Sequence, residues 1–95
     1  MDAYNPDTAI GANAWLALDE TQRIDLVEAY HRPIERGMDD DALKMHSLLH
    51  VIVENQLAEG LELIEQTVAR LGRQGLSRHE SVHAVAAYER SLALH

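Results

Sequence analysis

The amino-acid sequence predicts a small all-α protein, an antiparallel bundle of about four helices preceded by an irregular N-terminal arm at residues 1–12. Three observations support this prediction. Leu, Val, Ile and Ala supply most of the 46% hydrophobic content, while Phe is absent and Trp occurs once, a composition that favours helices over strands. Apolar residues recur at helical spacing. The 95 residues fit a single domain with one core.

The first long helix has clear start and stop signals. Residues 13–18 fit a short helical turn that ends before Asp19. Asp19 and Gln22 form a capping-box pattern, in which each side chain satisfies a free backbone N–H of the other residue. We therefore expect a helix over about residues 20–32, which Pro33 ends because proline cannot continue a helix.

The central helix is expected over about residues 40–59. The acidic run at residues 39–41 suits a helix N-terminus, where the helix dipole stabilises negative charge. Apolar residues then recur every three or four positions. Gly60 is placed to be the C-terminal cap.

Two more helices complete the predicted bundle. Apolar spacing indicates a helix over about residues 61–73. Ser77 and Glu80 form a second capping-box pattern, so the last helix is expected over about residues 78–94. Short loops between the helices favour antiparallel packing of neighbours.

Charge and composition exclude several classes of partner and location. The formal net charge of −8 repels phosphate backbones, so we expect no nucleic-acid partner. Zero cysteines rule out disulfides and thiolate metal ligands. Residues 1–12 lack the layout of a signal peptide, and the longest nearly apolar run, residues 48–53, is too short to cross a membrane. The sequence therefore predicts a cytoplasmic protein with no membrane partner.

Histidines and a glutamate recur at four-residue spacing in two of the predicted helices. His46, His50 and Glu54 lie one turn apart on the central helix, and His79 and His83 do so on the last helix. If these two helices pack together, four imidazoles and a carboxylate converge. Such ligands suit zinc, iron, nickel or copper. We therefore predict a metal site made by these five residues, with zinc or iron as the leading candidates.

The same spacing is compatible with a metal-free protein. In that case the histidines are partly buried residues that pack and donate hydrogen bonds to neighbouring helices. The protein would then be an interaction module, either a homodimeric regulator or the binder of another protein. That alternative predicts an exposed apolar patch or a symmetric interface, whereas the metal hypothesis predicts converging imidazoles.

One motif raises the possibility of a minimal hydrolase. Residues 79–83 match the His-Glu-x-x-His pattern of zinc metalloproteases. That class needs a third ligand brought round by a glycine turn, but Ala86 stands at the turn position and Glu89 at the ligand position. On a continuous helix Glu89 points away from the two histidines. Glu80 also has a simpler role in the capping box.

A second enzyme class shares part of the pattern. Glu28-x-x-His31 and Glu80-x-x-His83 match the Glu-x-x-His motif of carboxylate-bridged di-iron bundles. Such bundles also need glutamates from two other helices. Glu54 and either Glu62 or Glu65 are the candidates for these. The helices are short for an enclosed oxygen-activating site, so we expect binding or regulation in preference to catalysis.

Two segments that carry the histidines, residues 46–60 and 75–85, resemble DUF1841, a family of small bacterial proteins of unknown function. Residues 5–9 and 15–20 are similar to it as well. The resemblance covers most of the chain. It implies a short helical bacterial protein whose recognisable features are the two histidine-bearing segments, and it implies no activity.

Overall fold

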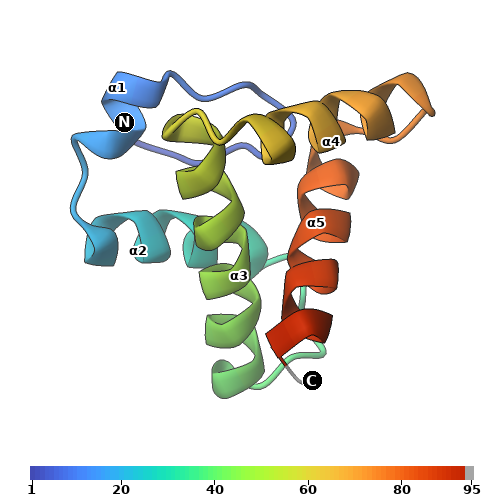
Figure 1. The fold of residues 1–95 in the computed structure, drawn as a ribbon. Coiled ribbons are helices and arrows are strands. Elements are labelled where there is room, and N and C mark those ends of the chain that lie inside the picture. Colours follow the sequence, from blue (N-terminus) through green and yellow to red (C-terminus); the bar gives the residue numbers. More distant parts are fainter. Residues whose placement is uncertain (94–95) are drawn as a thin grey trace.

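The structure, a computed structural model, describes residues 1–93 and is helical throughout its regular elements (Figure 1). The prediction of an all-α fold is confirmed. No helix in this part of the chain is long and apolar enough to cross a membrane. The five helices are α1 (Ala12–Leu16), α2 (Glu20–His31), α3 (Asp40–Ala58), α4 (Glu62–Arg73) and α5 (Arg78–Ala93).

The helices begin close to the positions expected from the sequence. α2, α3 and α5 start at the expected residues 20, 40 and 78, and α4 starts one residue later than expected. α2 and α3 each end one residue early, at His31 and Ala58. The expected end of the last helix, residue 94, lies outside the described residues.

Side-chain caps explain why the starts are so well defined. Asp19 accepts the backbone N–H of Gln22 at 2.8 Å, and Gln22 accepts the backbone N–H of Asp19 at 2.9 Å. Ser77 and Glu80 make the equivalent pair of bonds at 3.0 and 2.9 Å. Asp39 caps α3. Each cap satisfies backbone donors that a helix N-terminus leaves free.

A glycine ends α3 and turns the chain into α4. Gly60 has a φ of +75°, in the left-handed region that glycine adopts without a Cβ clash. Its N–H donates to the carbonyl of Leu57, and the next N–H, of Leu61, donates to the carbonyl of Gln56. This is the bonding pattern of a Schellman cap.

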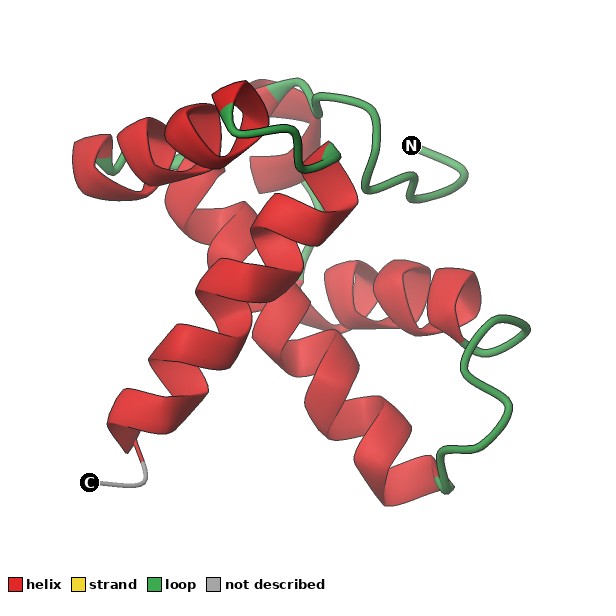
Figure 2. Ribbon diagram, turned by 90° about the vertical axis from the view of Figure 1, so that its right-hand side faces the viewer, coloured by secondary structure: helices red, strands yellow, loops and turns green. Residues whose placement is uncertain are grey.

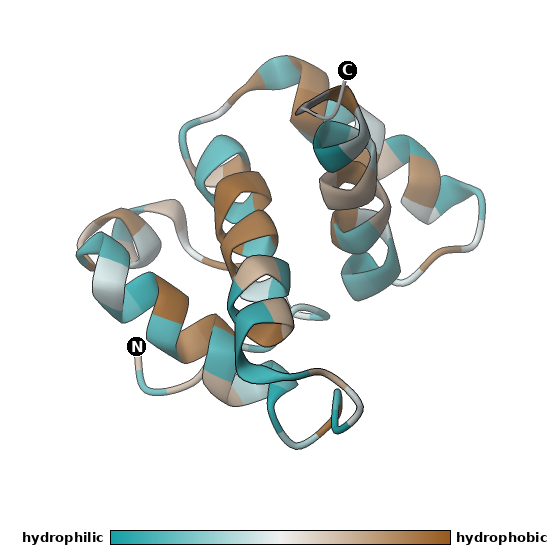
Figure 3. Ribbon diagram, turned by 90° about the horizontal axis from the view of Figure 1, so that it is seen from below, coloured by the Kyte–Doolittle hydropathy of each residue, from teal (hydrophilic) through white to brown (hydrophobic). Residues whose placement is uncertain are grey.

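α3 is the centre of the molecule. Seen from below, it lies between α2 on one side and α5 on the other (Figure 3). α5 runs antiparallel to α3, as expected, whereas α2 and α4 run across them (Figure 1). Figure 2 shows that α3 and α5 diverge toward the C-terminal end of α5. The two helices therefore leave room between their side chains at that end.

Two apolar clusters pack on different faces of α3. Val53 faces α4 and α5, where it packs with Ile64, Val82, Val85 and Ala86. Val51 belongs to the other cluster, together with Tyr4, Trp15 and Val27 from the arm, α1 and α2. Full burial of one such aliphatic side chain contributes about 1.5–3 kcal/mol. The stripe of α3 between these two faces carries His46, His50 and Glu54, so polar residues occupy the middle of the fold.

Candidate metal centre

Five histidines from three helices meet beside the polar stripe of α3, and we call them the histidine cluster. α2 contributes its last residue, α3 contributes two histidines one turn apart, and α5 contributes two from its first half. The members are His31, His46, His50, His79 and His83. The four histidines predicted from the sequence are thus brought together, and His31 joins them.

His50 lies in the middle of the cluster and is 0% exposed. Its ring faces all four other imidazoles. The centroid distances are 4.5 Å to His31, 4.7 Å to His46, 5.4 Å to His79 and 5.8 Å to His83. Imidazoles from every contributing helix therefore surround one ring.

Three of the histidines are arranged closely enough to form a metal site. His31, His50 and His79 each offer a ring nitrogen, and these nitrogens lie within 4.8 Å of one another. Zinc–nitrogen bonds are about 2.0–2.1 Å long, which places tetrahedral nitrogen ligands roughly 3.4 Å apart. The nitrogens therefore need to close by roughly 1.4 Å at most around an ion.

A backbone carbonyl fixes the orientation of His31. Its Nδ1 lies 2.8 Å from the carbonyl oxygen of Val27, one turn earlier in α2. A carbonyl oxygen only accepts hydrogen bonds, so Nδ1 carries the proton and the lone pair of the neutral ring is on Nε2. Nε2 is buried and has no hydrogen-bond partner within residues 1–93. In metal-bound histidines, the ring nitrogen that does not bind the ion usually donates a hydrogen bond of this kind to a carbonyl or carboxylate.

The buried rings are held in the neutral form that binds metals. Burial, together with the neighbouring imidazoles, lowers the pKa of His50 to about 2 and that of His46 to about 4. Burial also lowers the pKa of His31, although its bond to Val27 opposes the shift. Nε2 of His46 and both nitrogens of His50 lack partners among the described residues. Their lone pairs are therefore unused.

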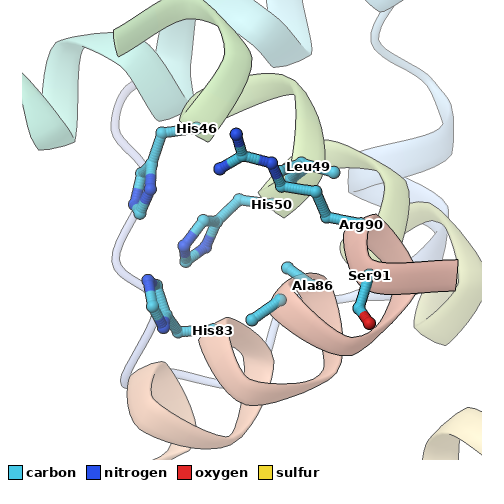
Figure 4. Close-up of a pocket in the computed structure, with 8 residues that line it drawn as sticks. His46, Leu49, His50, His83, Ala86, Arg90 and Ser91 are labelled. Carbon is cyan, nitrogen blue, oxygen red and sulfur yellow. The ribbon is translucent and has the colours of Figure 1, made fainter. Parts of the chain in front are cut away.

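The cluster can be reached from two sides. A pocket of about 310 Å³ opens between the diverging ends of α3 and α5, and the rings of His46, His50 and His83 face into it (Figure 4). A second pocket, of about 380 Å³, is lined by His79, His83 and Glu35. A small ion or ligand thus has a path to buried nitrogens.

Glu54, the predicted carboxylate ligand, has other partners. Its two oxygens accept hydrogen bonds from the guanidinium of Arg78 at 2.7 and 2.9 Å, and one of them also accepts the hydroxyl of Tyr4 at 2.5 Å. The side chain of Glu54 is 1% exposed. Because Arg78 starts α5 beside the end of the stripe, the structure places Glu54 in a buried ion pair with it and outside the group of histidine nitrogens that lie within 4.8 Å of one another.

The other glutamates considered from the sequence also have roles of their own. Glu28 pairs with Arg32 at 2.6 Å. Glu80 is exposed in the cap of α5, and the bonds from Ser77 lower its pKa. On α4, Glu62 accepts the side-chain amide of Gln66, and Glu65 is exposed. Of the carboxylates considered for a di-iron centre or a His-Glu-x-x-His hydrolase, Glu28, Glu62 and Glu80 thus have partners outside the histidine cluster.

Sequence reasoning missed two members of the site. His31 was noted only as part of a Glu-x-x-His pattern, yet it is 0% exposed in the cluster. Glu35 lies in the loop after α2, where no spacing pattern marks it, and it lines the pocket beside His79. The one sequence signal available for His31 was its place near the end of a predicted helix, two residues before Pro33.

Comparisons of the chain with protein-family profiles, with curated protein sequences and with solved structures gave no match. The site itself presents buried imidazole nitrogens with unused lone pairs beside two pockets.

Proposed function

We propose that this protein binds a transition metal ion, with zinc as the leading candidate and iron as the alternative, through His31, His50 and His79. One observation carries the proposal. The ring nitrogens of these three side chains, which come from three different helices, lie within 4.8 Å of one another. A bound ion would therefore join α2, α3 and α5 at one point.

The unsatisfied nitrogens favour metal binding over simple packing. A buried polar atom without a hydrogen-bond partner costs about 1–3 kcal/mol. His50 carries two such atoms, and His31 and His46 carry one each. Folded proteins usually avoid this cost. Coordination to an ion would satisfy the lone pairs and offset the cost.

The ligand type favours zinc. Neutral imidazoles suit zinc, and three histidines with a water or ligand in the fourth position form a familiar tetrahedral zinc site. Iron more often takes two histidines and a carboxylate. Glu35 is the carboxylate beside His79 and would supply that third ligand. In either case a coordination position remains for a small molecule, so the proposed activity is binding of the ion and of a ligand on it.

The first experiment is elemental mass spectrometry of untagged protein purified without a chelator. We expect close to one zinc or iron ion per chain, and we expect a His31→Leu, His79→Ala double variant to lose it. Adding the ion to metal-free protein should raise Tm, because an ion at 100 times its Kd stabilises the fold by about 2.7 kcal/mol. Ser47→Ala, a change at another buried residue of α3, is the matched control and should retain the ion.

Folded protein that stays metal-free and gains no stability from zinc or iron would contradict the proposal. The second candidate function, a homodimeric interaction module, would then be favoured. It has support in an apolar groove of about 590 Å³ between α4 and α5, where Leu63 and Tyr88 are 70% and 64% exposed. Arg70 and Glu89 both line this groove, so each of two symmetric copies offers the other a charge of opposite sign. Sedimentation velocity of the wild type and of Leu63→Glu tests this candidate.

A further inference from the structure

The position of His50 has a feature that one metal ion does not explain. Both of its ring nitrogens are buried, and neither has a hydrogen-bond partner in the described part of the chain. A single ion takes one of these nitrogens. The other nitrogen would still face the remaining imidazoles of the cluster unsatisfied, at a cost of about 1–3 kcal/mol.

The cluster divides into two triads that share His50. In the first triad, His31 and His79 lie 4.5 and 5.4 Å from the ring of His50 and 5.5 Å from each other, centroid to centroid. In the second triad, His46 and His83 lie 4.7 and 5.8 Å from His50 and 5.2 Å from each other. Each triad therefore places two imidazoles around the shared ring, and the first has its ring nitrogens within 4.8 Å of one another, whereas the second has to close further around an ion.

The second triad is the more open of the two. His46, His50 and His83 line the pocket of about 310 Å³ between α3 and α5, and Figure 4 shows the three rings facing one another across it. His83 is exposed and His46 is half-buried, so their side chains have room to rotate toward an ion. Nε2 of His46 has no hydrogen-bond partner in residues 1–93 and is available as a ligand.

We propose that the histidine cluster holds two transition-metal ions, the second bound by His46 and His83, with His50 bridging the two ions through its two ring nitrogens. This inference rests on the proposed function, because the first ion is the one bound by His31, His50 and His79. The second ion faces the pocket, where a small ligand can complete its coordination.

The bridge requires one proton to leave. Neutral His50 has a lone pair on one nitrogen and a proton on the other. The first ion binds the lone pair. When the second ion binds, the N–H bond breaks, the proton goes to solvent, and the electron pair of that bond forms the new nitrogen–metal bond. The bridging ring is then an anionic imidazolate, and its charge offsets part of the charge of the two cations.

Two charged side chains lie near the proposed second ion. Glu35 lines the adjoining pocket together with His83, and its carboxylate favours a cation there. Arg90 lines the pocket of the second triad and opposes a cation. Arg90 is exposed, so solvent and salt screen its repulsion. The charges around the pocket are therefore compatible with a second ion.

The test uses copper(II) as a spectroscopic probe, because two copper(II) ions joined by an imidazolate couple their unpaired spins. Metal-free full-length protein is titrated with copper(II) and passed through a desalting column. Bound copper is then measured by elemental analysis, and the electron paramagnetic resonance signal is integrated. We expect two coppers per chain and an integrated signal well below that of two isolated ions.

Two variants on α5 test where the second ion lies. His83→Ala changes an exposed residue, and this variant should bind one copper per chain. Its integrated signal should equal that of one isolated copper(II) ion. Ser91→Ala changes another residue of the same pocket and should still bind two coupled coppers. Two coppers with the full signal of isolated ions, two coppers in the His83→Ala variant, or one copper in the wild type would overturn the second site. In the last case the proposed function stands, whereas a protein that binds no copper, zinc or iron contradicts both.

Discussion

The imidazole rings of His31 and His50 lie 4.5 Å apart, centroid to centroid, and both side chains are 0% exposed. One is the last residue of α2 and the other is in the middle of α3. Neither ring donates a hydrogen bond to the other, and Nε2 of His31 has no partner within the described chain. Two polar rings buried side by side in this way cost stability in the metal-free protein, and that cost leads to the first prediction.

Replacing His50 by leucine should stabilise the metal-free protein while abolishing metal binding. The change removes two buried nitrogens without partners and keeps an apolar side chain in the core. We expect a gain of about 1 kcal/mol in the free energy of unfolding, which raises Tm by about 4–8 °C in a domain of this size. Scanning calorimetry with a chelator present measures the gain, and elemental analysis without a chelator measures the loss of metal.

Ser47→Ala is the control for this prediction. Ser47 is also 0% exposed on α3, and its hydroxyl oxygen has no partner in residues 1–93. The variant should gain a little stability and retain the metal, since a hydroxyl is not one of the proposed ligands. A His50→Leu protein that is less stable than wild type without metal would show that the imidazole contributes packing or bonds that leucine cannot replace.

The metal-free protein should lose stability as the pH falls from about 6.5 to about 4. In the fold, burial lowers the pKa of His46 to about 4 and that of His50 to about 2, whereas the unfolded chain has a histidine pKa of about 6.5. Between these values the unfolded state binds more protons than the folded state, so stability rises with pH. His31, His79 and His83 face these rings, and a proton on any of them adds repulsion. Above pH 6.5 the effect is absent.

Urea unfolding at pH 7.5, 5.5 and 4.5 with a chelator present measures this dependence. Carboxylates add a background of their own, which a His46→Leu, His50→Leu double variant retains. The loss of unfolding free energy between pH 7.5 and 4.5 should therefore be smaller in the double variant than in Ser47→Ala. Equal slopes in the two proteins would show that the buried histidines do not resist protonation.

Much of the fold follows from local sequence signals. The side chains of Asp19 and Ser77 start helices at the expected positions because capping involves only residues three apart in the chain. The four-residue spacing within each histidine pair is a local signal of the same kind. Residues one helical turn apart lie on the same face, so the sequence places His46 beside His50 and His79 beside His83.

The remaining members of the site depend on contacts between distant parts of the chain. His31 reaches the cluster because α2 crosses α3, and helix periodicity does not specify a crossing. Glu54 follows the histidines at the same spacing, yet its carboxylate binds Arg78 on another helix. Local patterns show which face of a helix a residue occupies, but the partner on that face is set by tertiary packing.

Glu35→Gln should weaken metal binding without changing the stability of the metal-free protein. Glu35 is half-buried in the loop after α2 and lines the pocket beside His79. Loss of one negative charge near a dication removes an attraction of about 2 kcal/mol at about 4 Å when water intervenes, and less at a longer distance. We expect about a tenfold increase in Kd for zinc, measured by competition with a chromogenic chelator.

Glu28→Gln is the matched control for Glu35. Glu28 is also a carboxylate associated with α2, but it pairs with Arg32 at 2.6 Å. Its replacement should leave the Kd for zinc unchanged. If both variants bind zinc as tightly as wild type, the carboxylate of Glu35 has no part in the site and the histidines alone hold the ion.

The final prediction separates the buried ion pair from the metal site. Glu54→Gln should destabilise the protein by about 3 kcal/mol, because removal of one partner leaves the other charge of a buried pair uncompensated. Arg78 would keep its bond to the carbonyl of Pro6 and at most one bond to the amide oxygen of Gln, while its charge would have no counterion. Tyr4→Phe removes one hydrogen bond to the same carboxylate and should cost about 1.5 kcal/mol. Urea unfolding measures both losses.

The two changes should not be additive, because Tyr4 and Arg78 bind the same carboxylate of Glu54. The Tyr4→Phe, Glu54→Gln double variant should lose less stability than the two single losses combined. Both single variants should bind zinc with the stoichiometry of wild type, measured by elemental analysis of folded protein. Loss of zinc in Glu54→Gln, with zinc retained in Tyr4→Phe, would instead show that Glu54 is a metal ligand. Both variants disturb the same ion pair, but only Glu54→Gln removes the carboxylate.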